Sequence, residues 1–182
     1  MGRRHRAWVH ARGQQPTPTC RAQSIARGKI QKNLMAKPIF VLNGPNLTML
    51  GKREPEIYGH HSLDDLEELC VQRATALGHK IEFRQSNSEG ELIGWIQEAR
   101  DGAAGIIINA AGLTHTSVAL LDALQAAERP VIEVHLSNIF RRETYRQHSY
   151  ISIGANGVIC GLGAKGYELA VEAMANICSA AK

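Results

Sequence analysis

Short apolar runs alternate along this chain with longer stretches in which apolar residues recur every three or four positions. The run at 39–42, Ile-Phe-Val-Leu, leaves neither face polar, which is typical of a buried strand in a parallel sheet. Further strands are predicted at 81–84, 105–108, 131–135 and 158–160. Because helical stretches separate these strands, the pattern favours an α/β fold with a doubly wound five-stranded parallel sheet and helices on both faces.

Capping residues bound the predicted helices. Ser62 is typical of an N-cap and Gly78 of a C-terminal cap, so the first helix lies between them. The other helices are predicted from Ser88 to Gly102, from Val118 to Glu128 ahead of Pro130, and from about Ala164 to Ala180. Two connections, 44–61 and 136–156, are long for a fold whose loops usually have about two to six residues. Both follow a strand, so they meet at the carboxyl edge of the sheet, where open α/β folds bind ligands.

Size and composition fit one domain without a membrane segment. The 182 residues suffice for one core and are too few for two domains of ordinary size. No apolar run approaches the ~20 residues that a membrane span requires. The four cysteines, at 20, 70, 160 and 178, show no C-x-x-C spacing and indicate neither a zinc site nor a disulfide framework. A reducing compartment, and hence a cytoplasmic location, is expected.

Positive charge is concentrated at the N-terminus. Residues 1–34 hold eight Lys or Arg and no Asp or Glu, which leaves 13 basic against 17 acidic side chains in the rest of the chain. Such a leader fits a transit-like segment, a basic arm, or translated upstream sequence that is not native. We favour upstream sequence, expect 1–34 to be disordered, and place the catalytic domain at 35–182. Nucleic-acid binding has support only from this leader and is not expected.

Polar residues follow the first and third predicted strands. The loop NGPNLTMLGKREPEIYG offers Asn46, Arg53 and Tyr58, although turn chemistry and a solvated arginine would explain it equally well. The segment NAAGLTHTS offers Asn109 and a helix N-terminus that attracts anions. Plain helix capping would explain its Thr and Ser residues but not His115, so we favour a binding role for this segment.

The fourth strand ends in Glu133-Val134-His135, and the two-residue period of a strand places Glu133 and His135 on one face. A carboxylate beside an imidazole raises the imidazole pKa and fixes the ring, as a general acid near neutral pH requires. A structural histidine is the alternative, but the end of a strand favours catalysis. In the following FRRETYRQHS segment, a short helical stretch would place Arg142 and Arg146 on one face, able to hold a carboxylate. The alternative there is a solvated basic turn.

The segment GLGAKG at 161–166 matches the G-x-G-x-x-G pattern of dinucleotide sites but precedes the last predicted helix instead of opening the fold. We interpret it as a tight strand-to-helix turn. No pair of histidines has the spacing of a zinc motif, and no lysine ends an apolar strand. Neither a metal nor imine catalysis is therefore expected.

Five motifs in order resemble the type II 3-dehydroquinate dehydratases: NGPNLTMLGKREPEIYG, RQSNSEGELIGWI, INAAGLTHTSVALLDAL, IEVHLSNIFRRETYRQHSYIS and GLGAKGY. The match runs across almost all of residues 39–170. The resemblance implies a flavodoxin-like fold without cofactor. It also implies conversion of 3-dehydroquinate to 3-dehydroshikimate through an enolate, either in the shikimate pathway of aromatic biosynthesis or in quinate breakdown.

The resemblance also implies a role for each matching residue. Tyr58 would take a proton from C2, Arg53 would stabilise the negative charge, and Asn46 would help to hold a water that stabilises the enolate. His135, oriented by Glu133, would protonate the departing C1 hydroxyl. The substrate carboxylate would bind at Leu136, Ser137 and Asn109, and the ring hydroxyls at His115, Asp122 and Arg146, with Arg142 supporting the tyrosine.

Members of this family assemble as trimers grouped into a homododecamer, so Asp122 is expected to reach a neighbouring subunit's site. The rival interpretation is a flavodoxin-like small-molecule binding module, such as a flavin protein or a phospho-receiver. A receiver needs acidic residues after the first strand and an aspartate ending the third, where this chain has Asn43 and Asn109. A flavin site normally has a hydroxyl-rich phosphate loop where this chain has NGPN.

Overall fold

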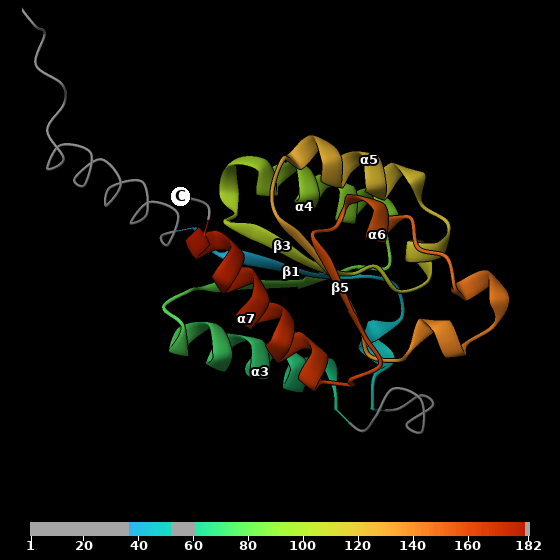
Figure 1. The fold of residues 1–182 in the computed structure, drawn as a ribbon, viewed down its shortest axis with the longest axis horizontal. Coiled ribbons are helices and arrows are strands. Elements are labelled where there is room, and N and C mark those ends of the chain that lie inside the picture. Colours follow the sequence, from blue (N-terminus) through green and yellow to red (C-terminus); the bar gives the residue numbers. More distant parts are fainter. Residues whose placement is uncertain (1–36, 52–60, 181–182) are drawn as a thin grey trace, which may run out of the picture.

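The computed structural model describes residues 37–51 and 61–180, and it contains a five-stranded parallel sheet (Figure 1). The strands are β1 (Ile39–Asn43), β2 (Ile81–Gln85), β3 (Gly105–Asn109), β4 (Val131–His135) and β5 (Gly157–Cys160). Their order across the sheet is β2-β1-β3-β4-β5, and each neighbouring pair runs parallel. Because this is the strand order of flavodoxin-like folds, the predicted fold class is confirmed.

Helices cover both faces of the sheet. The helices are α3 (Leu63–Ala76), α4 (Glu89–Gly102), α5 (Val118–Ala127), α6 (Ile151–Gly154) and α7 (Lys165–Ala180). Helices α3 and α7 lie against one face, and α4 and α5 lie against the other (Figure 1). The four long helices match the sequence-based boundaries to within one or two residues, and the short α6 was not predicted. None of the helices in the described part of the chain is long and apolar enough to cross a lipid bilayer.

The two-residue period of β1 explains this layering. Ile39 and Val41 pack in the core beneath α3 and α7, whereas Phe40 and Leu42 pack in the core beneath α4 and α5. All four are buried, since the strand is central and covered on both sides. The same alternation directs polar side chains at the strand ends to one layer or the other, and this decides which helix each one meets.

The long connection after β4 differs from the prediction. Residues 139–146 form two separate 3-10 turns, η3 (Ile139–Arg141) and η4 (Thr144–Arg146), and not one helical stretch. The side chain of Asn138 caps η3 by accepting a hydrogen bond from the amide of Phe140, and the backbone turns extended at Arg142 (φ −95°, ψ −173°). The predicted sharing of one helix face by Arg142 and Arg146 is therefore wrong.

The glycine-rich segment before α7 is a tight turn, as the sequence predicted. Gly161 (φ +83°) and Gly163 (φ +56°) have left-handed backbones, which glycine adopts without steric cost. Their amides donate to the carbonyl oxygens of His135 and Leu136, at N···O distances of 3.2 and 3.0 Å. These two hydrogen bonds therefore hold the chain segment that follows β4.

Strands β1 and β3 are neighbours at the point where the strand order reverses, which is where such sheets bind ligands. Their last residues, Asn43 and Asn109, are paired in register. The amide of Gly44 donates to the carbonyl of Asn109 at 2.8 Å. A Cβ atom at Gly44 would lie 2.5 Å from the carbonyl oxygen of Ala110, so the two chain segments need glycine to approach this closely.

We therefore expect Gly44→Ala to separate these two segments and to lower the free energy of unfolding by about 1–3 kcal/mol. Gly94→Ala is the matched control, because that glycine is exposed in α4 and a Cβ there meets no atom within 4 Å. The control should be neutral or stabilising by about 0.5–1 kcal/mol, since alanine favours helix. Urea denaturation at equal protein concentration measures both. Equal stability of the two variants would contradict the close approach.

Candidate active site

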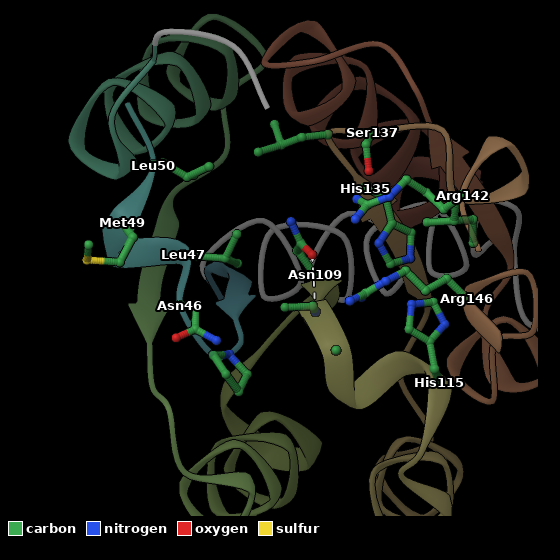
Figure 2. Close-up of a pocket in the computed structure, with 15 residues that line it drawn as sticks. Asn46, Leu47, Met49, Leu50, Asn109, His115, His135, Ser137, Arg142 and Arg146 are labelled. Carbon is green, nitrogen blue, oxygen red and sulfur yellow. Dashed lines mark hydrogen bonds between the residues drawn. The ribbon is translucent and has the colours of Figure 1, made fainter. Parts of the chain in front are cut away.

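A pocket lies at the carboxyl edge of the sheet, where the chain segments that follow β1, β3 and β4 meet (Figure 2). Its polar lining side chains are those of Asn46, Asn109, His115, His135, Ser137, Arg142 and Arg146. Figure 2 shows Asn109 between the residues that follow β1 on one side and the imidazole and guanidinium groups on the other. The lining residues from the described part of the chain include no Asp or Glu, so the pocket suits an anionic ligand.

Most of the predicted site residues come together here. Eight of them line the pocket: Asn46, Asn109, His115, His135, Leu136, Ser137, Arg142 and Arg146. Glu133 lies directly behind His135. Asp122 does not line this pocket; it lies on α5, where it is exposed. Arg53 and Tyr58 lie outside the described residues, so their roles stay predictions.

Glu133 and His135 form a hydrogen-bonded pair at the end of β4. The Nε2 atom of His135 lies 2.7 Å from Oε1 of Glu133. Glu133 has no exposed surface, and His135 is 5% exposed. An ionised carboxylate only accepts hydrogen bonds, so Nε2 carries a proton and the ring orientation is fixed.

Two further donors converge on Glu133, and the sequence did not single them out. The hydroxyl of Thr114 donates to Oε1, and the hydroxyl of Ser149 donates to the same oxygen at 2.7 Å. Burial by itself would raise the pKa of Glu133, but the hydrogen bonds from His135, Thr114 and Ser149 outweigh it and lower that pKa. Glu133 is therefore ionised at neutral pH. A buried glutamate beside a histidine implies such donors, although it does not say which residues supply them.

His115 presents an acceptor to the pocket. Its Nδ1 lies 2.7 Å from the carbonyl oxygen of His148, which can only accept, so Nδ1 carries the proton. Burial above all, and then the nearby charges of His135 and Arg146, lower the pKa of His115 despite the hydrogen bond to His148. The ring is therefore neutral at neutral pH. Its unprotonated Nε2 can accept a hydrogen bond from a ligand hydroxyl.

Arg142 and Arg146 both line the pocket, and both lie near the carboxylate of Glu143. The Glu143 carboxylate lies 3.5 Å from Nε of Arg142 and 3.1 Å from Nε of Arg146. Hydrogen bonding to its own backbone, and then the two guanidinium charges, lower the pKa of Glu143. The arginine side chains are 19% and 32% exposed, so their charges are partly desolvated. Both arginines thus belong to the site, although the single helical stretch predicted for them does not form.

The side chain of Asn109 has partners at both ends of its amide. Oδ1 accepts from the amide of Ala111 at 3.2 Å, and Nδ2 donates to the phenol of Tyr167 at 2.9 Å. Tyr167 is fully buried, and burial raises the pKa of its phenol. Tyr167 is therefore not a candidate for a catalytic base.

The loop after β1 is held by the segment that follows β2. The amide of Asn46 donates to the side-chain oxygen of Asn87 at 2.9 Å, and Asn46 adopts a left-handed backbone (φ +67°). Asn87 was not singled out from the sequence. Across the described segments, no three His, Cys, Asp or Glu side chains lie together as metal ligands would.

The sequence profile described as "Dehydroquinase class II" matches residues 37–175. The chain belongs to the class II dehydroquinase family. It is 62% identical over 143 residues to a 3-dehydroquinate dehydratase of Phenylobacterium zucineum, covering 79% of this chain and 99% of the relative. It is 55% identical over 145 residues to a 3-dehydroquinate dehydratase of Streptomyces avermitilis, covering 79% and 91%.

Solved structures of class II dehydroquinases share the fold. The type II dehydroquinase of Propionibacterium acnes superposes with a TM-score of 0.75 at 47% identity, covering 78% of this chain and 98% of that one. The type II dehydroquinase of Butyrivibrio crossotus gives a TM-score of 0.74 at 41% identity, covering 76% and 97%. The family predicted from the five motifs is thereby confirmed. As a class II dehydroquinase, the chain is an enzyme.

We expect Thr114→Val to lower the free energy of unfolding at pH 7 by about 1.5–3 kcal/mol, because it removes a donor to a buried carboxylate. Since the pKa of Glu133 is lowered in the folded state, the stabilisation is present above the ordinary glutamate pKa and is lost as pH falls through the lowered value. The cost of the substitution should therefore shrink in acid. Urea denaturation from pH 7 down through the ordinary glutamate pKa measures the free energy of unfolding of both proteins.

Thr75→Val on the exposed side of α3 is the control and should change stability by less than about 0.5 kcal/mol. A cost for Thr114→Val that is independent of pH would show that the hydroxyl does not act on the ionised form of Glu133.

Proposed function

We propose that this class II dehydroquinase is a hydro-lyase that converts 3-dehydroquinate to 3-dehydroshikimate through an enolate, in the shikimate pathway or in quinate breakdown. The observation that carries the proposal is the Glu133–His135 pair, 2.7 Å apart, at the wall of a pocket with two guanidiniums. The names of the relatives support the same reaction. No metal or cofactor takes part in the proposed steps.

His135 is the acid of the proposed reaction. A base first takes the proton from C2. His135 then protonates the C1 hydroxyl, which leaves as water while the C1–C2 double bond forms. The ionised, buried Glu133 keeps the ring oriented and compensates the charge of its protonated form. Among the described residues, Ser137 and Arg142 line the same pocket as His135.

Tyr58 is the base and Arg53 stabilises the negative charge; both roles come to this proposal from the family motif. A phenol with a pKa of ~10 is only about one part in a thousand ionised at pH 7. Lowering that pKa by ~2–3 units takes roughly 3–4 kcal/mol of preferential stabilisation of the phenolate. Partly desolvated guanidiniums can supply this. The place of Arg142 in the pocket wall supports it as the second guanidinium.

The remaining site residues bind the substrate. Its carboxylate lies against Leu136, Ser137 and Asn109, and its ring hydroxyls bind Arg146 and the neutral Nε2 of His115. Asn46 helps to hold a water near the enolate oxygen. The basic lining and the acceptor on His115 suit an anionic, hydroxylated ligand.

We further propose a homododecamer, a tetramer of trimers, located in the cytoplasm. Asp122 then completes the site of a neighbouring subunit, which agrees with its exposed position on α5 outside its own pocket. Large apolar side chains near β5 are exposed in the single chain, including Phe140, Ile153 and Leu162. Such exposure is typical of a surface that another chain covers.

The pure protein should convert 3-dehydroquinate to a product with the ultraviolet absorbance of a conjugated enone, after treatment with a chelator and without added cofactor. We expect His135→Asn to lower kcat about 10²–10⁴-fold, since a positioned general acid contributes that much, with KM changed only a few-fold. His61→Asn, at an exposed histidine ahead of α3, should leave turnover unchanged. A wild-type protein that forms no product would refute the reaction. Normal turnover of His135→Asn would refute only the acid.

Light scattering should give a mass of twelve chains of 19.9 kDa each. The mass should not depend on protein concentration across the micromolar range, because closed symmetric assemblies bury large interfaces. A monomer that turns over substrate at full rate would contradict both the assembly and the role of Asp122.

A further inference from the structure

A chain of hydrogen bonds runs through the core from β2 to the pocket. The Nδ2 atom of Asn43 donates to the carbonyl oxygen of Arg84 at 3.1 Å, and the phenol of Tyr167 donates to Oδ1 of Asn43 at 2.8 Å. Nδ2 of Asn109 donates to that phenol at 2.9 Å, and Oδ1 of Asn109 accepts from the amide of Ala111 at 3.2 Å. Asn43 and Tyr167 are fully buried and Asn109 is 4% exposed, so the three side chains are shielded from bulk water.

Elementary hydrogen-bond chemistry fixes the direction of every link. The carbonyl of Arg84 can only accept, so Asn43 turns its nitrogen to Arg84 and its oxygen to Tyr167. A phenol has one proton, and burial raises the pKa at which Tyr167 would lose it. That proton goes to Asn43, so Tyr167 can meet Asn109 only as an acceptor.

Asn109 therefore has one favourable amide orientation. A flipped amide would turn its oxygen to a phenol whose proton is already donated, and its nitrogen to the N–H of Ala111. Both contacts would be repulsive. Ala111 has a left-handed backbone (φ +52°), which costs free energy outside glycine, and its amide donates to Oδ1 of Asn109 from this strained position.

We propose that Tyr167, a residue of α7 outside the pocket lining, is a positioning residue for substrate binding. It sets the amide of Asn109 so that the second N–H, and not the carbonyl oxygen, is available to the substrate's carboxylate. This inference rests on the proposed function, in which Asn109 binds that carboxylate. An amide oxygen facing the carboxylate would repel it, so losing the orientation weakens binding more than it slows the chemical step.

Tyr167→Phe tests the proposal, because it keeps the buried ring and removes only the hydroxyl. We expect KM to rise about five- to tenfold and kcat to stay within about twofold, the signature of lost ground-state binding. Tyr145→Phe is the matched control: Tyr145 is 66% exposed and should leave KM unchanged. A merely structural role for Tyr167 would lower the melting temperature or the active fraction without moving KM. Such a result would overturn the proposal.

A double-mutant cycle with Asn109→Ala shows whether Tyr167 acts through Asn109. Asn109→Ala should itself raise KM, and adding Tyr167→Phe to it should change KM by less than about 1.5-fold, because coupled residues are not additive. If Tyr167→Phe raises KM by the same factor in the wild-type and in the Asn109→Ala background, the proposal is overturned, while Asn109 stays a substrate ligand. If Asn109→Ala leaves KM unchanged, the substrate contact in the proposed function fails, and the inference fails with it.

Asn43→Ala provides a second route if Tyr167→Phe does not fold. It frees the proton of Tyr167 to turn toward Asn109 without altering either residue, so the amide of Asn109 loses its fixed direction. We expect a KM increase that again disappears in the Asn109→Ala background. An unchanged KM in a folded Asn43→Ala protein, checked by circular dichroism and thermal melting, would overturn the proposal.

Discussion

The site depends on keeping one charged carboxylate in the protein interior. Glu133 has no exposed surface, and an isolated buried charge costs several kcal/mol in real proteins, with idealised estimates of about 20. Three donors compensate it, and they come from three different segments: His135 from β4, Thr114 from the turn after β3, and Ser149 from the connection before α6. The need to satisfy one carboxylate therefore draws together the segments that carry the imidazoles and guanidiniums of the pocket. The acid and its surroundings are one cooperative unit.

The two layers of the fold serve the pocket differently. Glu133 and His135 project from β4 on the same side as Val131, which packs beneath α4 and α5. Asn43 and Asn109 end strands whose alternate residues Val41 and Ile107 pack beneath α3 and α7, which is why they meet Tyr167 of α7. One layer thus supports the acid and the other supports the contact to the substrate. The pocket lies between them, at the edge where both sets of side chains emerge.

The sequence predicted those features that short-range patterns determine. Apolar runs located the strands, Ser62 and Ser88 located helix starts, and the period of two paired Glu133 with His135. It failed at Arg142 and Arg146, because the local cap by Asn138 and an extended residue outweighed the helical spacing. It also missed Thr114, Ser149 and Tyr167. Their partners lie 16 to 124 positions away in the chain, and no periodicity reports such contacts. Arg53, Tyr58 and the assembly remain predictions from the family resemblance.

The glycine-rich turn ahead of α7 has a consequence for how such motifs are interpreted. In a nucleotide site, backbone amides of a G-x-G-x-x-G loop would point outward to phosphate oxygens. Here the amides of Gly161 and Gly163 point back into the chain and are already occupied by the carbonyls of His135 and Leu136. A phosphate could bind them only by displacing the polypeptide that carries the acid. The same sequence pattern therefore forms an intramolecular turn here, and its amides bind the protein's own main chain.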